Sequence, residues 1–112
     1  MKANVKNVAA VKGTIEYKGV KLALSFTSAK LLEALMDIDN AYKAFGESKN
    51  DNLADIVAFA KAIKNCTYTV FECGGIPPEK VAELFPDDDI ADYAEFTNVL
   101  LSEFNKAMGT NK

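Results

Sequence analysis

Four residue types are missing from this chain of 112 residues: histidine, arginine, tryptophan and glutamine. Without His, the chain lacks the side chain whose ordinary pKa suits proton transfer near neutral pH, and it lacks the commonest metal ligand. Without Arg, it lacks the planar group that binds phosphates, carboxylates and guanine edges through paired hydrogen bonds. These absences disfavour catalysis and nucleic-acid binding, and we expect a small non-enzymatic binding domain without a metal or cofactor.

Long hydrophobic runs and strongly basic segments are absent as well. No stretch of about 20 apolar residues could span a bilayer, and no positively charged leader stands before an apolar run. The net charge is −3, and the acids concentrate late: residues 83–112 hold two Lys and seven acids, whereas residues 1–64 hold ten Lys and seven acids. Nucleic acid and anionic membranes attract clustered cations, so we expect neither as a partner. The composition favours a soluble cytoplasmic protein.

Both cysteines are expected to be free thiols within one compact domain. A chain with 49% hydrophobic content can bury a core of its own, so residues 1–112 are predicted to form a single domain with 1–7 and 109–112 as loose ends. Cys66 and Cys73 are separated by seven positions, roughly 10 Å along one helix, which is too far for a disulfide. The chain has no His to activate a thiol, so a catalytic Cys73 is disfavoured.

Two alternating apolar runs around Lys18-Gly19 predict an N-terminal β-hairpin. If these two residues form the turn, one side of the ribbon carries the apolar side chains Ile15, Tyr17, Val20, Leu22 and Leu24. The alternation extends back toward Val8, where the first strand is expected to begin. An isolated hairpin is marginal in water, so its apolar face must be covered. We expect it to pack on the helix that begins near Ser28.

Helical periodicity dominates the chain after the hairpin. Apolar residues at spacings of three and four predict a first helix that starts at Thr27 or Ser28. Gly46 is expected to end this helix in the left-handed conformation. After an exposed loop that ends in the capping residue Asn52, a second apolar series predicts one long helix up to Gly74-Gly75.

The second helix contains one ambiguous segment. Residues 67–71 are rich in β-branched and aromatic types and would pass for a strand, but the helical phase continues across Asn65 and favours a helix. Pro77-Pro78 opens a short helix that Pro86 stops, and a last helix follows the aspartates and ends at Gly109. The expected fold class is α+β, with an N-terminal β-hairpin or small antiparallel sheet packed on a bundle of three to four helices.

Clustered aspartates raise the question of a metal site. Asp87, Asp88 and Asp89 stand at the expected start of the last helix, where free N–H groups and the helix dipole stabilise carboxylates. Helix capping explains them better than cation binding, because no calcium-loop pattern surrounds them. The segment 37–40 opens like a calcium loop but lacks the later ligand and the glycine, so it is interpreted as a helix surface. No metal site is predicted.

Apolar residues outside the main core rows indicate a docking surface. The predicted helices are amphipathic over a wide arc, and Phe71, Phe85 and Leu101 lie off the main apolar rows. Exposed apolar residues of this kind mark protein–protein contacts. These three residues are therefore the candidate partner-binding site, and no catalytic residue is assigned.

Four segments of the chain carry a family resemblance. GTIEYKGVKLALSF runs straight into TSAKLLEAL, and NLADIVAFAKA and IPPEKVAELF follow on later helices. This layout, over about residues 12–108, resembles the tail assembly chaperones of long-tailed bacteriophages and prophages. The resemblance implies a non-enzymatic assembly factor in the bacterial host cell that binds the long tape measure protein, keeps it soluble and helps recruit tail tube subunits. The family has no invariant site residues to transfer to this chain.

Two other classes of function remain open. A phage head–tail connector or minor structural protein would share the small, acidic and mixed α/β character. A small regulatory module of the antitoxin or anti-repressor type would bind a basic partner through the acidic C-terminal part. Self-association is open in every case.

Overall fold

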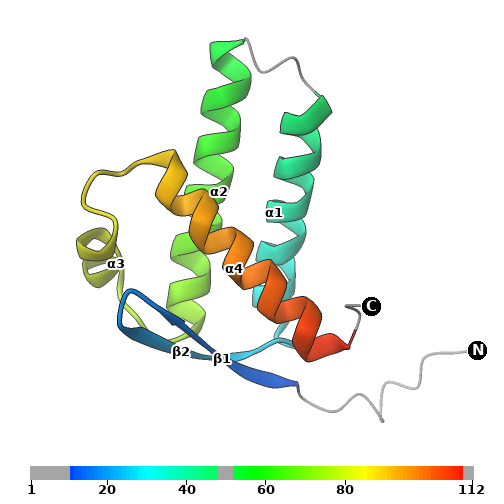
Figure 1. Ribbon diagram of the computed structural model, residues 1–112, viewed down its shortest axis with the longest axis vertical. Coiled ribbons are helices and arrows are strands. Elements are labelled where there is room, and N and C mark those ends of the chain that lie inside the picture. The colour runs from blue at the N-terminus through cyan, green and yellow to red at the C-terminus, as the bar shows by residue number, and fades with distance from the viewer. Residues whose placement is uncertain (1–10, 48–51, 110–112) are drawn as a thin grey trace, which may run out of the picture.

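The computed structural model describes residues 11–47 and 52–109, which form an α+β fold as predicted. A two-stranded antiparallel sheet is followed by four helices: β1 (Lys12–Tyr17), β2 (Val20–Ser25), α1 (Ala29–Glu47), α2 (Leu53–Cys73), α3 (Pro78–Leu84) and α4 (Ile90–Met108). Figure 1 shows α1 and α2 side by side, α4 crossing α2, and the hairpin near the start of α1 and the end of α2.

The two strands form the predicted hairpin, with Lys18 and Gly19 as its turn. The φ angles of 51° and 81° at these residues are typical of a type I′ turn, whose twist matches that of paired strands. The face that was predicted to be apolar is buried and contains Ile15, Tyr17, Leu22 and Leu24. This burial confirms the register. The expected start of the strand near Val8 lies outside the described residues.

α2 is one continuous helix through the segment that also resembled a strand. Asn52 caps its start, because the side-chain oxygen accepts a hydrogen bond of 2.8 Å from the N–H of Ala54. Thr67 is fully buried, and its hydroxyl donates to the carbonyl of Ile63 at 2.7 Å, which satisfies the polar group inside the helix. The helix ends at the predicted glycine pair, where Gly75 has a φ of 84°.

α1 runs through Gly46 and ends at Glu47, so the expected stop at Gly46 is wrong. Among the described glycines, positive φ angles occur only at Gly19, Gly75 and Gly109. A glycine inside a helix costs only about 1 kcal/mol relative to Ala, so the helix continues through this exposed position.

The prolines and aspartates delimit the last two helices as predicted. Pro78 occupies the first turn of α3, where its missing N–H is not needed. Asp89 caps α4, because its carboxylate accepts a hydrogen bond of 2.9 Å from the N–H of Ala91. Gly109 ends α4 in the left-handed conformation with a φ of 70°.

The hairpin packs against α4, and the expectation that it packs on α1 is corrected. β1 lies beside α4, and the Tyr17 hydroxyl donates a hydrogen bond of 2.9 Å to the Glu95 carboxylate. Phe26, which follows β2, meets the ring of Phe104 edge-on at a centroid distance of 5.7 Å. α1 instead packs along α2. β1 and α4, the first and last elements within the described residues, are therefore neighbours in space (Figure 1).

Candidate protein-binding groove

α1 carries a second apolar row beside the row that faces the core. Leu31, Leu35 and Ile38 are buried. Leu32 and Met36 lie one turn apart on the neighbouring row, where they are 39% and 58% exposed. The apolar arc of α1 is therefore wider than the part of the helix that the described residues cover.

α4 has the same arrangement. Its core row includes the fully buried Phe96 and Leu100. The adjacent row holds Leu101 and Phe104, which are half-buried, and Met108, which is 38% exposed. The apolar surface of α4 therefore continues beyond the part that the core covers.

The two exposed rows meet in an open hollow of about 340 Å³. Its lining comes from both helices and consists of Leu32, Leu35, Met36, Asp39, Leu101, Phe104 and Asn105. We call this hollow the α1–α4 groove. The hydroxyl of Tyr42 on α1 lies 2.7 Å from that of Thr97 on α4, about one turn from the groove along each helix, and this hydrogen bond holds the two helices together. The groove is thus preformed and mostly apolar.

The charged residues beside the groove are paired within their own helices. Lys43 lies 3.1 Å from Asp39 on α1, and Lys106 lies 3.6 Å from Glu103 on α4. Both pairs are exposed, so they add little to stability. Each pair does neutralise a charge beside the apolar surface, and the groove therefore selects an occupant by apolar contact more than by charge.

Phe71 and Phe85, two of the three predicted partner-binding residues, are not at the surface. They are 0% and 2% exposed. The Phe85 ring stacks on Tyr93 at 4.7 Å and on Tyr17 at 5.8 Å. The Phe71 ring lies 4.7 Å from that of Phe96. Their assignment as surface residues is wrong because the hairpin and α4 converge on these rings. Together the five rings form what we call the aromatic cluster.

Leu101, the third predicted residue, lines the α1–α4 groove. Sequence reasoning misses the other apolar residues that open onto the groove: Leu32, Met36 and Phe104. Leu32 and Met36 repeat the four-residue spacing of Leu31 and Leu35 one position later, and this parallel row is the signal that could have revealed them.

The aspartate cluster has structural partners. Asp88, at a φ of 51°, lies 2.9 Å from the Lys64 ammonium and accepts a hydrogen bond of 2.6 Å from the Tyr93 hydroxyl. The hydrogen bonds from Tyr93 and then from Lys64 lower the pKa of Asp88 below its ordinary value. Asp89 caps α4. Over residues 11–47 and 52–109, no group of three or more His, Cys, Asp or Glu side chains is placed to hold a metal ion.

Cys66 and Cys73 are free thiols, as predicted. Burial raises the pKa of Cys66 to about 11, and the charge of Asp37 adds to the shift. Burial also raises the pKa of Cys73. Reactive thiols have lowered pKa values, so both cysteines are protonated near neutral pH and neither has the character of a nucleophile.

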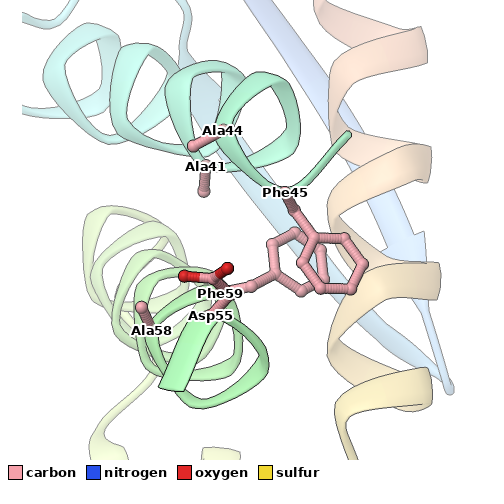
Figure 2. Close-up of a pocket in the computed structure, with 6 residues that line it drawn as sticks. All are labelled: Ala41, Ala44, Phe45, Asp55, Ala58 and Phe59. Carbon is pink, nitrogen blue, oxygen red and sulfur yellow. The ribbon is translucent and has the colours of Figure 1, made fainter. Parts of the chain in front are cut away.

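A second, smaller hollow lies between the end of α1 and the start of α2 and has a volume of about 130 Å³. Figure 2 shows its lining, which consists of Ala41, Ala44, Phe45, Asp55, Ala58 and Phe59. The rings of Phe45 and Phe59 stack at 4.3 Å and bound one side. Asp55 stands in the first turn of α2, where the helix dipole stabilises an acid. This hollow has room for one small side chain, whereas the α1–α4 groove has room for several.

A search for membrane-spanning helices and comparisons with known proteins add no further indication of function. None of the helices within the described ranges combines the length and the apolarity needed to cross a membrane. Comparison of the chain with protein-family models, with curated proteins and with solved structures gives no match.

Proposed function

We propose that this protein is a non-enzymatic tail assembly chaperone of a long-tailed bacteriophage or prophage, acting in the cytoplasm of the host cell. It binds an amphipathic helix of the tape measure protein in the α1–α4 groove and assists assembly of the tail tube. The observation that carries the proposal is the groove itself, an apolar hollow that opens to solvent between two helices.

An amphipathic helix suits the shape and chemistry of the groove. The groove lies between two helices, and a third helix can place apolar residues spaced three and four apart between them. Met36 is the most exposed of the apolar groove residues, and its flexible thioether side chain adapts to different neighbours. A chaperone for a long client with many similar helices needs such adaptable contacts.

Two substitutions in the groove test the proposal. In Met36→Asp and Leu101→Asp, a new carboxylate faces the apolar occupant, so each variant is expected to bind recombinant segments of the tape measure protein at least ~10-fold more weakly. Isothermal titration calorimetry measures the affinity. Circular dichroism of each variant verifies that the helices remain folded.

Leu53→Asp is the matched control. Leu53 is 75% exposed at the start of α2 and is not part of the groove, and the substitution adds the same charge. Its affinity for the same segments should equal that of the unaltered protein. If Leu53→Asp weakens binding as much as the groove variants do, contact in the groove is not the cause.

Neutralising two acids near the start of α4 distinguishes the regulatory alternative. Asp87→Asn combined with Asp92→Asn should change the association rate and its salt dependence more than the affinity. If this double variant abolishes binding while both groove variants bind normally, the contact is electrostatic. A small acidic regulatory module would then be the better assignment.

A further inference from the structure

Along the outer edge of β1, backbone N–H and C=O groups form no hydrogen bond with any described residue. The sheet has two strands within the described residues, so β1 pairs on one side only. The Phe26 N–H donates to the Val11 carbonyl, and hydrogen-bonded pairs alternate along an antiparallel ladder. The odd-numbered residues of β1 therefore bond to β2, and the outward N–H and C=O groups belong to Lys12, Thr14 and Glu16.

The side chains of these three residues form a symmetric charge pattern. All three are exposed on the solvent face of the hairpin, and neither Lys12 nor Glu16 forms an ion pair with a described residue. Thr14 lies midway between the cation and the anion. When such a strand pairs antiparallel with itself about Thr14, each Lys12 lies opposite the Glu16 of the other copy.

We propose that β1 pairs antiparallel with β1 of a second copy of this chain about a twofold axis at Thr14, so that the dimer contains a four-stranded sheet. The two Thr14 residues exchange backbone hydrogen bonds, and two Lys12–Glu16 pairs flank them on the exposed face. On the buried face, Gly13 of one copy lies opposite Ile15 of the other, and the Phe26 ring of the first copy occupies the space where a Gly13 side chain would stand. The interface is isologous.

A second copy of this chain suits the edge of β1 better than an unrelated strand does, and the edge of β1 suits self-pairing better than the edge of β2. Charged side chains on an edge strand oppose pairing with unrelated apolar strands, but here the charges complement one another when the strand meets itself. The outer edge of β2 lacks this property. Its Ser25 carbonyl already accepts a hydrogen bond of 3.0 Å from the Ser28 N–H, and self-pairing about Ala23 would place Lys21 opposite an uncharged serine. The inference is independent of the proposed chaperone function.

Charge reversal in the full-length protein tests the dimer. Sedimentation equilibrium at low ionic strength should show the unaltered chain of 12.2 kDa in a concentration-dependent equilibrium with a species of twice that mass. Lys12→Glu and Glu16→Lys should each weaken dimerisation about tenfold, because two attractive cross-strand pairs become two like-charged pairs. The double variant, in which both charges are exchanged, should dimerise like the unaltered chain.

Mixing the two single variants is the sharpest part of the experiment. One variant then has two acids on the edge and the other has two lysines, so the equimolar mixture should form a heterodimer more strongly than either variant dimerises alone. A mixture that stays as monomeric as its components would overturn the proposed register. A sedimentation mass of one chain at every concentration of the unaltered protein would overturn the dimer itself.

Proline substitution tests the backbone hydrogen bonds separately. Thr14→Pro removes an outward N–H without removing a bond to β2, and proline is tolerated on edge strands. Its expected effect is loss of the dimer with retention of the folded monomer. Ala23→Pro, the matched change on the outer edge of β2, should dimerise normally. Dimerisation of Thr14→Pro at the affinity of the unaltered chain, or loss of the dimer in a folded Ala23→Pro alone, would contradict pairing through β1.

Discussion

The aromatic cluster and the α1–α4 groove are both apolar and both contain residues of α4, but the cluster is buried and the groove is open to solvent. The cluster receives rings from four parts of the chain, namely β1, the end of α2, the residue after α3, and α4: Tyr17, Phe71, Phe85, Tyr93 and Phe96. The groove is lined by two helices. Burial therefore depends on how many elements converge at a site and not on the hydrophobicity of its residues alone.

The largest expected effect comes from removing a ring at the centre of the cluster. Phe96 is fully buried, and its ring centroid lies 5.2 Å from Tyr17 and 4.7 Å from Phe71. Phe96→Ala should lower the free energy of unfolding by about 3–5 kcal/mol, because the cavity cannot be filled without moving several elements. Urea denaturation measures the change. A loss below about 1 kcal/mol would mean that the cluster is no more tightly packed than an exposed surface.

A smaller and pH-dependent effect is expected at the rim of the cluster, where Tyr93 donates its hydroxyl to Asp88. The folded-state pKa of Asp88 lies below its ordinary value of 3.8, so the carboxylate stabilises the fold above that pH and loses this effect as the pH falls through the lowered value. Asn is a suitable replacement for Asp88, because it removes the charge and also tolerates the positive φ at this position.

Asp88→Asn should therefore lower the Tm near neutral pH, and the difference from the unaltered protein should shrink in acid. Thermal unfolding followed by circular dichroism between about pH 7 and pH 2 measures the difference. A Tm difference that stays constant over this range would show that the charge of Asp88 does not contribute.

The smallest expected effect on stability lies in the groove. Met36 is 58% exposed, so Met36→Ser should change the free energy of unfolding by no more than about 0.5 kcal/mol. The same urea experiment used for Phe96→Ala gives the value. A loss of several kcal/mol would mean that the groove is part of the core and would remove the contrast between the two regions.

Several element ends could be predicted from the sequence because residues close to them in the chain mark them. The hairpin turn at Lys18-Gly19, the cap at Asn52 and the stop at Gly109 all follow from local conformational preferences. Gly46 shows the limit of this reasoning, since a glycine permits the left-handed conformation without requiring it.

The packing partners could not be predicted in the same way. Periodicity shows which face of an element is apolar, but it does not show which other element covers that face. Phe71 and Phe85 lie outside the main apolar rows and yet are buried, because β1 and α4 meet above them. Leu32 and Met36 lie beside a core row and yet are exposed, because α4 crosses α2 and leaves them open. The groove could therefore be recognised only in part, through Leu101.

The contact between the first and the last element has a consequence for how the chain is made. The Tyr17 hydroxyl bonds to Glu95, 78 positions later in the chain. At a synthesis rate of about 5–20 residues per second, the apolar face of the hairpin lacks its α4 cover for roughly 4–16 s, until α4 has been synthesised. The fold therefore cannot be completed until α4 has been translated. A truncated protein that ends before α4 would lack this cover over the apolar face of β1 and β2 and would be prone to aggregate.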